Sequence, residues 1–363
     1  QEDGLVNSNV RALVRDYQGF LWIGTEDGLH RYDGTHMKIY RNVTGDSLTL
    51  SSNFILSLFE DSSNNLWVGT LDGGLNVYNR RTDTFTRCDL GEGSRTIRSF
   101  VEAPDGFLYV GTDRLVRTPV KSGSTGNFET LPLGLQKEYT SGLRLASMSL
   151  MSDTTLLLSI PTQGLYVYSL VTGKSHQFTA TKSDPEFEAI YVDRHRGIIW
   201  GGTWRNGLVA HDPASGRERW FRTDQQVMKS NFISTITGDR TGDVWIGTDK
   251  GLVQCSKMVN PFEGDALTVY LPEDNHHSGI KGVIVKAVHI DRSNKVWAGM
   301  YYEGVNVYDQ TAMAFGSATI PALGPDVYTN VSSIETDREG TIWIGLDGGG
   351  LYMTRDSWEN IQR

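Results

Sequence analysis

Two short segments of the 363-residue chain combine aromatic rings with planar polar groups. The first is Trp204, Arg205 and Asn206, and the second is Tyr301, Tyr302 and Glu303. Aromatic rings can stack on the apolar face of a sugar, while guanidinium, amide and carboxylate groups hydrogen-bond its hydroxyls. The two segments therefore predict a surface that binds an oligosaccharide. The alternative is that these rings cap the edge of a sheet or pack on a neighbouring loop.

In other units, acidic residues lie in the corresponding turn, after the tryptophan strand. They are Glu26, Asp72 and Asp347, and we include them among the candidate ligand-binding residues. Two carboxylates about 5–9.5 Å apart could hydrolyse a glycosidic bond. Nothing in the sequence pairs these carboxylates, so we assign no catalytic residue. Turn formation is the alternative role for the two aspartates, because aspartate readily hydrogen-bonds the backbone ahead of it.

The elements that must position these residues are copies of one repeat. Residues 21–25 read Leu-Trp-Ile-Gly-Thr, and related pentapeptides begin at Leu66, Leu108, Ile199, Val244, Val296 and Ile342, with a degenerate copy at Leu156. The seven steps from Trp22 to Trp343 average about 46 residues, so the chain holds eight units. Their approximate bounds are 8–50, 51–95, 96–138, 139–182, 183–228, 229–276, 277–328 and 329–363.

Each unit is expected to contain four short strands, as the first unit illustrates. An apolar run at 10–14 ends in the turn 16–19, where an aspartate accepts backbone hydrogen bonds and a glycine takes a positive φ. The tryptophan strand 21–25 follows, and then strands at 28–32 and 37–40. Four antiparallel strands in every unit predict an all-β fold, a single β-propeller over residues 1–363.

The number of blades in the ring follows less directly from the pattern. Packing sheets around an axis buries both faces of each sheet, whereas an orphan sheet would expose both. One eight-bladed ring is favoured for this reason, and the alternative is a seven-bladed ring followed by one extra unit. Either ring places the repeated tryptophans between blades. These are Trp22, Trp67, Trp200, Trp245, Trp297 and Trp343.

The composition limits the classes of function. The chain has 34 Lys and Arg against 43 Asp and Glu, a net charge of −9, which argues against nucleic acid as a partner. No apolar run approaches the ~18 residues of a membrane-spanning helix. Cys88 and Cys255 are the two cysteines, and neither has a metal-type spacing partner. We therefore expect no metal and no cofactor.

The repeats resemble a known family. The first one combines Ser8-Asn9-Val10, a turn ending at Gly19, and the tryptophan strand followed by Asp27-Gly28-Leu29. This order of motifs is similar to the two-component regulator propeller repeat, which builds the periplasmic sensor region of hybrid two-component systems in gut-dwelling Gram-negative bacteria. Rings in that family are usually seven-bladed, often two in tandem.

The resemblance implies a periplasmic module of an inner-membrane protein that senses oligosaccharide fragments. The signal would pass to a histidine kinase, and so to transcription, through an adjacent β-sandwich domain of the same polypeptide. Two other functions stay open at this point: a propeller glycosidase or lyase acting on a polysaccharide, and a propeller that only binds other proteins. A homodimer is also compatible with the pattern.

Overall fold

A computed structural model describes most of the chain. The described residues are 5–93, 95–121, 127–135, 143–161, 163–178, 186–225, 227–272, 280–309, 331–337, 339, 341–346 and 350–354. Asp347 lies outside them. The chain divides into two compact units, Gln1–Gln310 and Thr311–Arg363, each of which is described by itself.

Eight antiparallel sheets follow one another along the chain, and each lies within one predicted repeat unit. The first three are β1 (Val10–Arg15), β2 (Leu21–Thr25), β3 (Gly28–Tyr32), β4 (Met37–Tyr40); β5 (Ile55–Glu60), β6 (Leu66–Thr70), β7 (Leu75–Asn79), β8 (Thr84–Cys88); and β9 (Ser99–Glu102), β10 (Phe107–Gly111), β11 (Leu115–Pro119), β12 (Glu129–Leu131). The next three are β13 (Ser147–Ser152), β14 (Thr155–Ile160), β15 (Gly164–Ser169), β16 (Ser175–Phe178); β17 (Phe187–Asp193), β18 (Ile198–Thr203), β19 (Leu208–Asp212), β20 (Arg217–Phe221); and β21 (Ile233–Gly238), β22 (Val244–Thr248), β23 (Gly251–Cys255), β24 (Thr268–Tyr270). The last two have three described strands each: β25 (Val285–Ile290), β26 (Val296–Met300), β27 (Val305–Tyr308), and β28 (Val331–Thr336), β29 (Ile342–Leu346), β30 (Gly350–Thr354). A short 3-10 helix, η2 (Thr223–Gln225), follows β20.

The turn between the first two strands of a blade also positions its tryptophan. Asp16 Oδ1 accepts the backbone N–H groups of Gln18 and Phe20, both at 3.0 Å, and Gly19 takes a φ of +91°. The other carboxylate oxygen accepts Trp22 Nε1 at 2.8 Å. The same bond joins Asp61 to Trp67, Asp239 to Trp245, Asp291 to Trp297 and Asp337 to Trp343. One aspartate therefore fixes both the turn and the core side chain.

The prediction that the tryptophans lie between blades is confirmed most clearly in the first six sheets. Trp22, Trp67, Trp200 and Trp245 are fully buried. Trp22 packs with Ile55 and Leu66 of the next blade in one apolar cluster. Trp297 is partly exposed and packs against Val10 and Leu13 of the first blade. Trp343 is also partly exposed, and because its sheet is the one described sheet of the second unit, the prediction does not hold for it. Burial of the indole ring between sheets thus contributes to the inter-blade packing.

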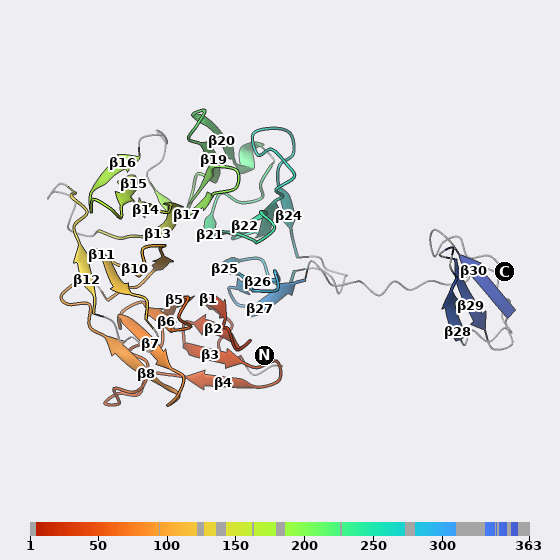
Figure 1. The fold of residues 1–363 in the computed structure, drawn as a ribbon, viewed down its shortest axis with the longest axis horizontal. Coiled ribbons are helices and arrows are strands. Elements are labelled where there is room, and N and C mark those ends of the chain that lie inside the picture. Colours follow the sequence, from red (N-terminus) through yellow and green to blue (C-terminus); the bar gives the residue numbers. More distant parts are fainter. Residues whose placement is uncertain are drawn as a thin grey trace. The chain divides into compact units, whose positions relative to one another are not determined.

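Seven blades form the ring, with their first strands nearest the centre (Figure 1). A glycine of the second strand receives the first apolar residue of the next blade. The pairs are Gly24–Ile55, Gly69–Ile97, Gly111–Leu145, Gly202–Ile233, Gly247–Val285 and Gly299–Val10. Ser159 replaces the glycine in the fourth blade and donates to the carbonyl of Phe187 at 2.6 Å.

The contact between Gly299 and Val10 closes the ring between its seventh and first blades. β1 packs directly against β25 and β26, and Val10, Leu13 and Ala287 share one apolar cluster. The eight repeat units are confirmed as eight sheets. The ring itself has seven blades, which was the alternative prediction. The favoured prediction of an eight-bladed ring is wrong, because β25 of the seventh blade already packs against β1 of the first.

The eighth sheet, β28–β30, belongs to the second unit. Ile344, Leu346 and Tyr352 form a small apolar cluster within it. Ile334 and Leu351 are 58% and 54% exposed. The exposed apolar faces that we expected to disfavour an extra sheet are therefore present in this unit.

Candidate ligand-binding site on the propeller axis

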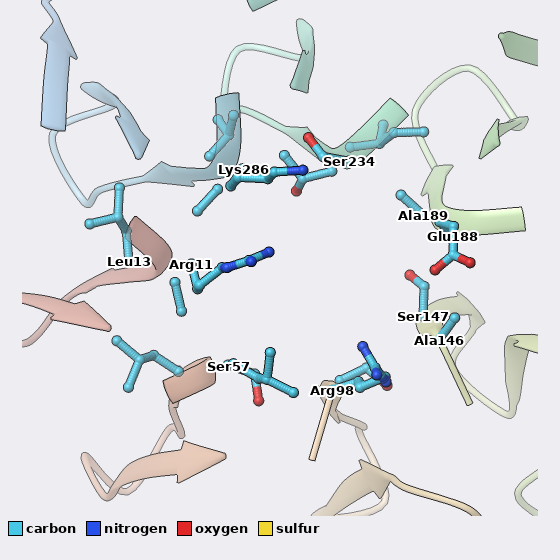
Figure 2. A pocket seen from close by; sticks show the side chains of 18 of the residues that line it. Arg11, Leu13, Ser57, Arg98, Ala146, Ser147, Glu188, Ala189, Ser234 and Lys286 are labelled. Atoms are coloured by element: carbon cyan, nitrogen blue, oxygen red, sulfur yellow. The ribbon is translucent and has the colours of Figure 1, made fainter. Parts of the chain in front are cut away.

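The first strands of the seven blades surround a pocket of about 380 Å³ on the axis of the ring. Each blade contributes the residue that follows its buried first apolar residue, because neighbouring side chains of a strand point to opposite sides. These residues are Arg11, Leu56, Arg98, Ala146, Glu188, Ser234 and Lys286. Figure 2 shows Arg11, Arg98, Glu188 and Lys286 extending from different blades into one central space.

One side of the pocket mouth is built around Trp204, which follows β18. Its ring is 50% exposed and stacks on Phe232, with ring centroids 6.0 Å apart. The guanidinium of Arg144 lies 5.8 Å from the indole centroid and forms a two-pronged ion pair with Glu188, with one N–O distance of 3.0 Å. The stacked ring and the ion pair hold Trp204 at the edge of the pocket with half its surface free.

The opposite side is built around Arg11 on β1. Its Nε donates to Glu26 Oε1 at 2.8 Å, and Asn9 Nδ2 donates to the other carboxylate oxygen at 3.1 Å. The Arg11 guanidinium lies 5.3 Å from the ring centroid of Tyr301. Lys286 Nζ lies 5.9 Å from the same centroid. Cations and aromatic rings thus alternate around the mouth, where cation–π attraction orders them.

Among the predicted residues, Trp204 lines the pocket, and Glu26 and Tyr301 contact Arg11, which also lines it. Tyr302 is next to Tyr301: its ring centroid lies 4.0 Å from that of Tyr301, and its side chain is 61% exposed. Its φ of +79° is unusual for a residue with a Cβ atom and turns its ring toward solvent.

The remaining predicted residues lie elsewhere or serve the backbone. Arg205 and Glu303 are exposed in their loops. The backbone N–H of Asn206 donates to Thr203 Oγ1 at 2.8 Å, and its carbonyl accepts from Arg222, so this residue helps to shape the turn. Asp72 lines a separate polar hollow of about 500 Å³ with neighbours that include Asn53, Arg87 and Arg95.

Arg11, Arg98, Arg144, Glu188 and Lys286 are site residues that the repeat pattern does not predict. This pattern indicates binding residues in loops, because the strands are already committed to packing. The missed signal is the register of the first strands: a charged residue directly after a buried β-branched or aromatic residue faces the axis. Aligning the seven first strands would have shown Arg98, Glu188 and Lys286 at one position.

Two cations of the pocket, Arg98 and Lys286, lack direct polar contacts to the side chains that the structure describes. Within the described part of the chain, neither forms an ion pair or a side-chain hydrogen bond. Burial lowers the pKa of Arg98, and the positive charge of Arg144 lowers that pKa further, while the negative charge of Glu188 offsets part of the shift. Burial and the charge of Arg11 likewise lower the pKa of Lys286, and the charges of Asp249 and Glu26 offset part of that shift. Both shifts indicate positive charges that are crowded and incompletely solvated.

Two properties of the described residues bear on other classes of function. These residues contain no group of three or more His, Cys, Asp or Glu side chains that could hold a metal ion. They also include no helix with the length and hydropathy that a membrane span requires.

Comparison with known proteins confirms the resemblance of the repeats. The family model described as "Two component regulator propeller" matches residues 4–27, 49–72 and 228–250. Histidine kinase P4 of Formosa agariphila is 49% identical over 49 residues, which are 14% of this chain and 4% of that protein.

Solved structures show the same fold. The extracellular domain of a hybrid two-component system from B. thetaiotaomicron superposes with a TM-score of 0.71 at 22% identity, over 98% of this chain and 47% of that one. Virginiamycin B lyase from Staphylococcus aureus gives a TM-score of 0.61 at 13% identity, over 82% of this chain and 94% of the lyase. This chain therefore spans about half the length of the hybrid-system domain that it matches.

Proposed function

We propose that this chain, which carries two-component regulator propeller repeats, is the ligand-sensing module of a hybrid two-component system and recognises an oligosaccharide fragment at its axial pocket. The observation that carries the proposal is the composition of the pocket mouth. Trp204 offers a half-exposed ring for stacking, and Arg11 and Lys286 on the same pocket wall offer hydrogen-bonding groups, with Glu26 bound to Arg11. A sugar needs this combination of a flat apolar surface and fixed polar groups.

The proposal places the chain on the periplasmic side of the inner membrane. A histidine kinase of the same polypeptide would receive the signal through an adjacent β-sandwich domain. A closed ring offers few internal hinges, so we expect ligand binding to change how the ring packs on its partner domain or on a second copy of the chain. Only a difference in ligand affinity between the two packings can drive such a shift.

A lyase or glycosidase is the second candidate, because the fold is shared with virginiamycin B lyase. The carboxylates at the mouth, Glu26 and Glu188, are each ion-paired with an arginine. Acid–base chemistry needs a group free to exchange a proton with the substrate, and the paired arrangement fits binding better. A propeller that only binds other proteins would contact its partner through the exposed loops, and the axial pocket would play no part.

A panel of neutral and acidic oligosaccharides separates these functions. A bound sugar at 100 times its dissociation constant should stabilise the folded chain by about 2.7 kcal/mol without being consumed. Trp204→Ala should weaken binding. The control is Tyr17→Ala, which removes an exposed aromatic ring from the turn that follows β1 and should leave binding unchanged. Release of shorter sugars or an unsaturated product would support the enzyme instead.

A further inference from the structure

We infer that the axial pocket is specific for acidic sugars, whose carboxylate or sulfate groups are neutralised by Arg98 and Lys286. This inference rests on the proposed function, since it names the class of oligosaccharide for the same site. Neutral sugars would be bound by the rings at the mouth alone.

The first support is the balance of charge around the pocket. Arg11 pairs with Glu26 and Arg144 pairs with Glu188, so these four charges cancel. Arg98 and Lys286 add two positive charges that no described carboxylate binds. The whole chain carries a net charge of −9, so the axial pocket runs against the overall composition. A concave site with an excess of positive charge, here Arg11, Arg98 and Lys286 against Glu188, concentrates anions from solution.

The second support is the surroundings of the two cations. Lys286 Nζ lies 4.4 Å from the ring centroid of Phe232, and Arg98 lies beside Phe100 and Ser99 on the pocket wall. The rest of the wall mixes apolar side chains, among them Leu13, Leu58, Ile236 and Val288, with the hydroxyl groups of Ser57, Ser147 and Thr235. A partly buried charge that forms no ion pair is costly, because it has lost part of its hydration. A ligand anion would remove that cost, and charge-assisted hydrogen bonds would then form in a partly desolvated site.

The third support is the size and shape of the site. A volume of about 380 Å³ lies at the small end of the ~300–1,000 Å³ that small-molecule sites occupy. It suits the terminal sugar of an oligosaccharide, with the next sugar reaching the exposed ring of Trp204. The acidic group would enter the pocket, and the neutral faces of the sugars would meet the aromatic mouth.

Three galactose-based probes separate the chemistry of the acidic group. Trigalacturonate carries carboxylates, neocarrabiose 4-sulfate carries a sulfate, and β-1,4-galactotriose carries neither. Calorimetric titration of the full chain should show tight binding of one or both acidic probes and at least tenfold weaker binding of the neutral one. The affinity for the acidic probe should fall when the salt concentration is raised from about 0.05 to about 0.5 M, because salt screens the charges.

Two variants test the residues. Arg98→Gln and Lys286→Met should each weaken binding of the acidic probe about 10- to 100-fold, the effect of losing one hydrogen-bonded charge, and leave neutral probes unaffected. The control is Arg81→Gln, an exposed arginine in the turn between β7 and β8. Thermal unfolding of the free Arg98→Gln variant should have an unchanged or raised midpoint, because an unpaired, crowded cation has been removed. A merely structural arginine would lower that midpoint.

The outcomes separate the inference from the proposed function. Equal affinity for the neutral and acidic probes would overturn the inference and leave the sensor intact. Tight binding of an acidic probe that neither variant weakens would also overturn it, since the anion would then bind elsewhere. Failure of every sugar in the panel to bind would overturn the proposed function itself.

Discussion

The contact between Val10 and Gly299 closes the ring, and its strength can be measured. Val10 is fully buried, and a Cβ atom on Gly299 would lie 2.5 Å from Val10 Cγ1. Gly299→Ala therefore forces β1 and β26 apart, and overpacking of this kind lowers the free energy of unfolding by about 1–3 kcal/mol. Val10→Ala removes two buried methyl groups, which costs about 2 kcal/mol.

The two substitutions together should cost less than the sum of their separate effects. The new methyl group at position 299 fits the space that Val10 vacates, so we expect a coupling energy of about 1–2 kcal/mol. Urea unfolding of the wild type, both single variants and the double variant measures this coupling, and equal m-values show that the same transition is compared.

Val10→Ala combined with Gly69→Ala is the matched control. Gly69 contacts Ile97 between the second and third blades, so the effects of this pair should add to within about 0.5 kcal/mol. Equally additive effects for Val10 and Gly299 would refute closure between the first and seventh blades.

Three further predictions concern stability and the site. Asp239→Ala should lower the free energy of unfolding by about 2–3 kcal/mol in urea titration, because Trp245 Nε1 and the turn N–H groups lose their acceptor; a loss below about 0.5 kcal/mol would contradict the role of this bond. Burial lowers the pKa of His289 to about 4, and its neutral Nε2 accepts the backbone N–H of Arg15 at 3.0 Å. The unfolded chain binds this proton near pH 6.5, so stability should be complete above that pH and fall by up to about 3 kcal/mol as the pH drops to about 4; an unchanged pH profile in His289→Gln would count against it. Acrylamide should quench the fluorescence of Trp204 in the free chain, and bound sugar should protect it; protection that persists in Trp204→Phe would show that the sugar covers another ring.

The repeating parts of the fold were predictable from the sequence because each repeat forms the same turns and buries the same positions between sheets. The strand bounds, the Asp-Gly turns and the buried Trp22, Trp67, Trp200 and Trp245 all follow from local patterns. The number of blades in the ring did not follow. It depends on a small rotation between sheets, set by contacts such as Gly299 with Val10 that join residues almost 300 positions apart.

The candidate site was predicted only in part. Glu26, Trp204 and Tyr301 depart visibly from the repeat or recur at a loop position. Trp204 lines the axial pocket, and Glu26 and Tyr301 contact the pocket residue Arg11. Arg98 and Lys286 were not predicted, because a single charged residue in an apolar strand is also typical of a strand whose apolar and polar residues alternate. The role of these two residues depends on closure of the ring, because closure turns one side of every first strand toward the same axis.

A crystal structure of the chain with its tightest-binding acidic probe tests the account most directly. We expect a carboxylate or sulfate oxygen within about 2.7–3.2 Å of the Arg98 guanidinium or of Lys286 Nζ, and a sugar ring over Trp204. A probe bound in the hollow around Asp72, or on the outer edge of a blade with the axial pocket empty, would contradict it.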